Sequence, residues 1–158
     1  MQTMTETAAH IRELATLAAR GVGFATRDAE VFGKAVLWHL ADGGDPDAVI
    51  RALSDPEDSP IVRLPLVLAD LQRAFGAVSG PIELTLNADD TELALSYARL
   101  VPHAHAAVVG EPSSPPRLRL EPSTATEPPL PDRAKLPNRL GEHFSALAER
   151  AEAAQAAH

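Results

Sequence analysis

The sequence predicts an α+β domain: an N-terminal cluster of helices packed on a small antiparallel four-stranded meander, then a proline-rich linker and a C-terminal amphipathic helix. Three observations predict it. Apolar residues recur at helical spacing through the first half of the 158-residue chain. After Pro81 the period changes to alternation of apolar and polar residues. Eight of the 14 prolines fall within residues 111–137, ahead of a last helical stripe.

The first two helices are expected at Thr5–Arg20 and from Thr26 to about Leu40. Gly21 is the predicted stop of the first helix, and Thr26 is the predicted cap of the second. The second helix is apolar over most of its circumference, which predicts a central place in the core.

Two further helices complete the predicted cluster, which fills residues 5–80. Asp45-Pro46-Asp47 is typical of a helix start with proline in the first turn. After the loop SDPEDSP, another helix is expected to start at Pro65 and to end before Gly80.

Four short strands are expected within residues 82–121, because apolar and polar residues alternate in each of them. They are residues 82–86, 93–97, 105–109 and 116–121. Short connections between them predict a meander with one apolar face.

The domain organisation follows from these elements. Residues 1–121 form a single α+β domain, residues 122–139 a proline-rich linker, and residues 140–158 a terminal helix. In that helix Leu140, Phe144 and Leu147 lie on one apolar stripe, which is expected to dock on the domain or on a partner.

Composition narrows the classes of function. The formal net charge is −8 and the cations are scattered, so we expect no nucleic-acid partner. The absence of cysteine excludes disulfides and thiolate chemistry. The N-terminus lacks the features of a signal peptide and no apolar run is long enough for a membrane span, which predicts a cytoplasmic protein with no membrane contact.

Arg20, Trp38 and His39 are the candidate contacts for a ligand or a partner. Arg20 adjoins the glycine-containing stretch GVGFAT, and Trp38 and His39 lie on the helix that follows. A dinucleotide-binding loop requires a strand before it, whereas here a helix precedes. We therefore interpret GVGFAT as a helix–turn–helix connection.

His103 and His105 are the candidate metal ligands, because residues two apart on a strand face the same side. A metal site needs at least a third ligand. The nearby Glu111 is expected to lie past the end of the strand, so we favour two histidines facing water and expect no cofactor.

Catalytic patterns are not evident in the residues. Glu83, Asp89, Asp90 and Glu92 cluster around the first hairpin, where we expect a solvated turn. The serines lack a nucleophile-elbow context. These observations favour a protein without enzymatic activity and leave catalysis open.

Two motifs resemble those of a known family. Residues 18–23 read Ala-Ala-Arg-Gly-Val-Gly, and residues 33–38 read Gly-Lys-Ala-Val-Leu-Trp. Both resemble the opening of an uncharacterised family of short bacterial proteins, a domain of unknown function. Residues 140–150 resemble the C-terminal helix of that family. The resemblance implies these helix boundaries, and it implies no activity because the family has none established.

The function expected from the sequence is that of a non-catalytic accessory or assembly protein acting through protein–protein contacts, with a protein partner or a second copy. The alternative is a small-molecule-binding or enzymatic module with a pocket between the helices and the sheet, near Arg20, Trp38 and His39.

Overall fold

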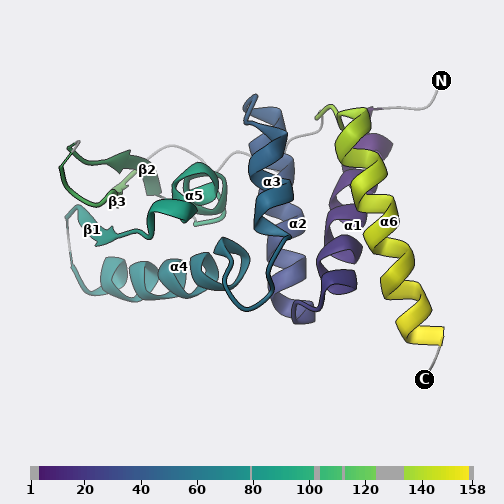
Figure 1. Ribbon diagram of the computed structural model, residues 1–158. Coiled ribbons are helices and arrows are strands. Elements are labelled where there is room, and N and C mark those ends of the chain that lie inside the picture. Colours follow the sequence, from purple (N-terminus) through teal and green to yellow (C-terminus); the bar gives the residue numbers. More distant parts are fainter. Residues whose placement is uncertain (1–3, 79, 102–103, 112, 124–133, 157–158) are drawn as a thin grey trace.

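The computed structural model describes residues 4–78, 80–101, 104–111, 113–123 and 134–156 (Figure 1). It has the predicted α+β class. The helices are α1 (Met4–Val22), α2 (Thr26–Ala41), α3 (Pro46–Ala52), α4 (Pro60–Ala77), the short 3₁₀ helix η1 (Ala88–Asp90), α5 (Thr91–Ala98) and α6 (Asn138–Ala156). The strands are β1 (Ile82–Thr85), β2 (Ala104–Val109) and β3 (Arg117–Pro122).

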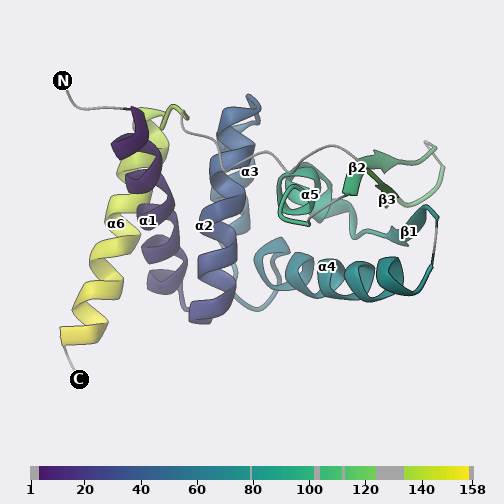
Figure 2. The same ribbon diagram turned by 180° about the vertical axis from the view of Figure 1, so that it is seen from behind.

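The elements form an elongated molecule. At one end α6, α1 and α2 lie side by side; α3 follows α2, and α4, α5 and the sheet form the other end (Figures 1 and 2). Phe32, Ala35 and Val36 of α2 are buried, which confirms the central place predicted for this helix. No described helix is long and apolar enough to cross a membrane.

Three predicted helix ends need correction. Helix α1 continues past Gly21, and the chain turns at Gly23, whose φ of +122° favours glycine. Helix α2 begins at Thr26, but Ala25 holds the cap position and gives no side-chain hydrogen bond. Helix α4 begins at Pro60 and therefore contains Pro65, because the Ser59 hydroxyl caps it by accepting a hydrogen bond from the Ile61 amide at 3.1 Å.

The strand predicted at residues 93–97 is wrong, because this segment is helix α5. Its sequence is rich in the helix formers Glu, Leu and Ala. The buried residues Leu93, Ala94, Tyr97 and Ala98 follow a helical spacing, whereas Leu95 is exposed. The alternation of Leu93, Leu95 and Tyr97 therefore did not reflect a sheet face.

The sheet consequently has three antiparallel strands, not four, in the order β1-β3-β2. The register pairs Leu120 with Ile82 and Ala106, and Leu118 with Leu84 and Val108. These side chains form the apolar face that packs on the helices. The opposite face is polar and carries ion pairs from Arg117 and Arg119 to Glu83.

Helix α6 packs on α1 of the same chain. Leu140, Phe144 and Leu147, the three residues of the predicted apolar stripe, are buried in the hydrophobic core. The two helices approach so closely that a Cβ added at Gly21 would lie 1.9 Å from the Leu147 carbonyl oxygen. Asp47 of α3 and Arg139 form an ion pair of 2.6 Å at the start of α6.

Replacing Gly21 by alanine is expected to lower the free energy of unfolding by about 1–3 kcal/mol, as overpacking does in a well-packed core. The backbone of Leu147 cannot make room without displacing α6. Gly76→Ala is the control: it lies in α4 with no atom within 4 Å of the added Cβ, so helix propensity is expected to make it neutral or stabilising. Chemical denaturation measures both, and an equal effect at the two sites would contradict the close approach.

Candidate functional site: a charged pocket between α3, α4 and α5

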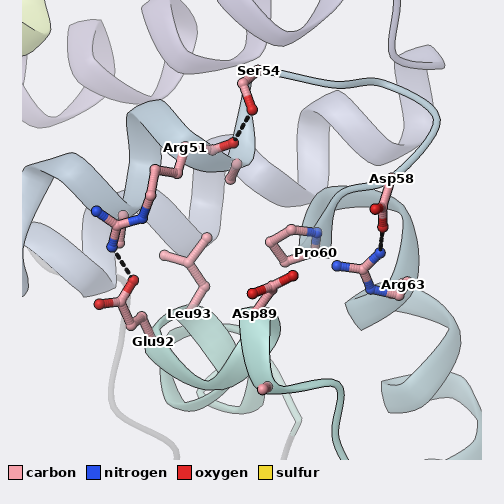
Figure 3. A pocket seen from close by; sticks show the side chains of 11 residues that line it. Arg51, Ser54, Asp58, Pro60, Arg63, Asp89, Glu92 and Leu93 are labelled. Carbon is pink, nitrogen blue, oxygen red and sulfur yellow. Dashed lines mark hydrogen bonds and ion pairs between the residues drawn. The ribbon is translucent and has the colours of Figure 1, made fainter.

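A pocket of about 550 Å³ opens where α3, the start of α4, η1 and α5 meet (Figure 3). We call it the charged pocket. Two arginines and three carboxylates supply its charged lining: Arg51, Arg63, Asp58, Asp89 and Glu92. Its apolar lining comes from Ala48, Ala52, Pro60, Ala88 and Leu93. The lining residues come from two segments, 48–63 and 88–93, which the fold brings together.

Arg63 is held firmly on one wall of the pocket. Its Nε donates to both carboxylate oxygens of Asp90, at 3.0 and 2.9 Å, and one terminal nitrogen donates to Asp90 Oδ1 at 2.7 Å. The other terminal nitrogen pairs with Asp58. Hydrogen bonds to Asp90 and then to Asp58 raise the pKa of Arg63. Asp90 is only 1% exposed, so the prediction that it lies in a solvated turn is wrong.

Arg51 forms the opposite wall and is held more loosely. It comes from the last turn of α3 and pairs with Glu92 of α5 (Figure 3). The two side chains are 57% and 52% exposed, and exposed ion pairs of this kind stabilise a fold by about 0–1 kcal/mol. The Ser54 hydroxyl donates to the Arg51 carbonyl at 2.7 Å, which fixes the backbone at the end of α3.

Asp89 lies between these walls, and its carboxylate points into the pocket (Figure 3). The Asn87 side chain accepts a hydrogen bond from the Asp89 amide at 3.0 Å, which sets the backbone of η1. Within the part of the chain that the structure describes, the Asp89 carboxylate has no ion-pair or hydrogen-bond partner. The pocket therefore combines an unpaired carboxylate with an arginine in an exposed ion pair.

The structure does not bring the predicted contacts Arg20, Trp38 and His39 together. Arg20 lies near the turn into α2, whereas Trp38 lies twelve residues after Thr26, about 18 Å further along the helix. Trp38 is buried, and the guanidinium of Arg99 stacks on its ring at 4.7 Å.

His39 is also buried, and its Nε2 is 2.8 Å from the Asp45 carbonyl oxygen. Its ring lies against Gly44, so it packs on the turn that connects α2 and α3. None of the three residues lines the charged pocket.

Of the two predicted metal ligands, His103 lies outside the described residues. His105 is exposed on the polar face of the sheet, opposite Glu121 of β3. Ala104, Ala106 and Val108 pack against the core, as predicted for this strand. Among the described residues, no group of three or more histidine, aspartate or glutamate side chains is placed to hold a metal ion.

Tyr97 is the only tyrosine of the chain, and its buried hydroxyl has no hydrogen-bond partner among the described residues. Burial, and then the charges of Asp28 and Asp90, raise the pKa of Tyr97 well above 10.0.

Tyr97 in the unfolded chain therefore ionises at lower pH than in the folded chain, so the free energy of unfolding is expected to fall as the pH rises above about 10. An alkaline titration followed by phenolate absorbance and circular dichroism should show ionisation and unfolding together. Ionisation before unfolding would contradict this.

No protein-family model, curated protein or solved structure matches the chain. The resemblance to a family of short bacterial proteins therefore stays a prediction. In the structure the glycines of the two motifs allow helices to pack closely. Gly21 leaves space for the backbone of α6, and a Cβ at Gly33 would lie 2.7 Å from the Arg12 carbonyl oxygen of α1. Ala18, Ala19, Ala35 and Val36 are buried between these helices.

Sequence reasoning missed Arg51 and Arg63 as site residues. In the sequence they are isolated cations, separated by 41 residues from Glu92 and by 27 residues from Asp90 respectively. The available signal was the acidic cluster Asp89, Asp90 and Glu92, which requires nearby cations once one of its members is buried.

Proposed function

We propose that the protein is a small-molecule-binding protein and that the charged pocket is its site. The observation that carries this proposal is that Arg51, Arg63 and Asp89, which come from three separate elements, line one cavity together with apolar side chains. Its volume of about 550 Å³ lies in the range of small-molecule sites. Charged side chains in such a cavity can orient a ligand, and the apolar side chains beside them can cover its carbon atoms.

The position of α6 is the reason for preferring this function to the accessory role expected first. That expectation relied on the apolar stripe of the C-terminal helix as a surface for a partner. Leu140, Phe144 and Leu147 instead pack in the core of their own chain. The charged pocket, in contrast, is open and lined by side chains that a ligand can reach.

A thermal-shift screen across metabolites and metal ions tests the proposal, because a ligand that binds only the folded state raises Tm. Ser54→Trp is designed to fill the mouth of the pocket from an exposed lining position. Gln72→Trp places the same side chain on the exposed side of α4, away from the pocket. We expect a compound that stabilises the wild type and Gln72→Trp but not Ser54→Trp. A shift that survives in Ser54→Trp, or no shift with any compound, would contradict the proposal.

A second candidate is the non-catalytic accessory role, through contacts with a protein partner or a second copy. It is favoured by Leu66 of α4, a large apolar side chain that is 65% exposed. Purification at native levels, followed by size-exclusion chromatography and mass spectrometry, tests it. A complex or oligomer that Leu66→Lys disrupts would support this role, and a monomer without partners would contradict it.

A further inference from the structure

The charges of the pocket indicate which class of ligand it takes. The lining carries two guanidinium groups and three carboxylates. Asp90 and Asp58 saturate Arg63, and Glu92 pairs with Arg51. The carboxylate of Asp89 is left without a counterion, so it can receive a positively charged group of a ligand. An ammonium group is suited to this position because it donates up to three hydrogen bonds.

The second charge of the ligand follows from the difference between the two arginines. The Arg63–Asp90 contact is made by three hydrogen bonds to a buried carboxylate, so a ligand cannot displace it cheaply. Arg51 and Glu92 form an exposed pair of little net energy. The contact joins Arg51 Nη2 to one oxygen of Glu92. A carboxylate from a ligand can therefore bind the other N–H groups of the guanidinium, or displace Glu92 at little cost.

We propose that the charged pocket binds a small zwitterion of the free amino acid class, with its ammonium group on Asp89 and its carboxylate on Arg51. Leu93 lies between Arg51 and Asp89 (Figure 3), and Ala48 and Ala52 also line the pocket, so apolar surface is available to the side chain of the amino acid. This inference rests on the proposed function, because it names the ligand class of the same pocket.

Isothermal titration with the proteinogenic amino acids, one at a time, tests this class. For each amino acid that binds, the α-methyl ester lacks the negative charge of the α-carboxylate, and the N-acetyl derivative lacks the positive charge of the α-ammonium group. We expect the zwitterion to bind at least about tenfold more tightly than either derivative, since each loses one charge-assisted contact. An ester that binds as tightly as its parent amino acid would overturn the zwitterion class and would leave the pocket as a binding site for cations.

Two substitutions test separately the contact of the ligand ammonium with Asp89 and the contact of the ligand carboxylate with Arg51. Asp89→Asn and Arg51→Gln are each expected to weaken amino acid binding about tenfold or more. Arg73→Gln, which alters an exposed ion pair on α4, should leave it unchanged. Both pocket residues are exposed, so melting curves should confirm that the variants fold.

The outcomes also distinguish this inference from the proposed function. If no amino acid binds but another compound of the wider screen binds and is blocked by Ser54→Trp, only the zwitterion class is overturned. If nothing binds in either experiment, both are overturned. Binding that Asp89→Asn and Arg51→Gln leave intact would place the ligand outside the pocket and would also overturn the inference.

Discussion

Replacing Arg63 by methionine is expected to lower the free energy of unfolding by about 3 kcal/mol, the lower end of the range for a broken buried ion pair. The reason is that Asp90, 1% exposed, then keeps a buried charge without its counterion. The lower end applies because the Arg63 side chain is itself 27% exposed. Denaturant unfolding followed by circular dichroism measures the change.

Arg73→Met is the matched control, because Arg73 also lies on α4 and pairs with an aspartate, Asp70, but both are well exposed. Its effect is expected to stay within about 0.5 kcal/mol. Adding Asp90→Asn to Arg63→Met should recover part of the loss, because the buried charge is then absent. Equal effects at Arg63 and Arg73, or strict additivity with Asp90→Asn, would contradict the account of this ion pair.

Phe144→Ala is expected to lower the free energy of unfolding by about 3–5 kcal/mol, the range for removing a fully buried phenylalanine ring. Phe144 is the largest apolar side chain of α6 in the core, so its removal leaves a cavity between α6 and the rest of the chain. Thermal or denaturant unfolding of the two proteins gives the difference. Glu149→Ala, on the exposed side of α6, is the control and should change stability little.

The same experiment tests whether α6 docks within its own chain. Intramolecular docking makes Tm independent of protein concentration, whereas docking on a second copy makes Tm rise with concentration. The structure predicts no concentration dependence for the wild type. A rise in Tm with concentration, or a Phe144→Ala variant as stable as Glu149→Ala, would show that α6 is not held on α1 as described.

The helical half of the fold was predictable because its apolar residues repeat at helical spacing over long segments. Asp45 illustrates this at the level of one residue: its side chain accepts a hydrogen bond from the Asp47 amide at 2.9 Å, as expected of a cap. Helix α5 was not predictable from periodicity alone. It is eight residues long, and over so short a window the apolar residues Leu93, Leu95 and Tyr97 fit an alternating pattern as well.

The order of the strands depends on that error. With α5 between β1 and β2, these two strands do not pair, and β3 inserts between them. The apolar face nevertheless agrees with the predicted alternation, since Leu118 and Leu120 are fully buried and Arg117 and Arg119 lie on the polar face. Alternation fixes the face of a strand, whereas its neighbours depend on the chain between the strands.

The charged pocket could not be predicted from the sequence for a related reason. Its arginines and carboxylates become neighbours only through the packing of α3 and α4 on α5. The buried Ser59 helps to set this geometry, because its hydroxyl donates to the Ala52 carbonyl at the end of α3 while it caps α4. No spacing within one segment carries this information.

Binding of a small molecule in the charged pocket is tested most directly by nuclear magnetic resonance on the isotope-labelled protein, which maps the residues that a ligand contacts. The backbone amides are followed while the best compound of the screen is added. We expect saturating shifts that concentrate in residues 48–63 and 88–93 and disappear in Ser54→Trp. Shifts centred on another part of the molecule, or equal shifts in Ser54→Trp, would contradict it.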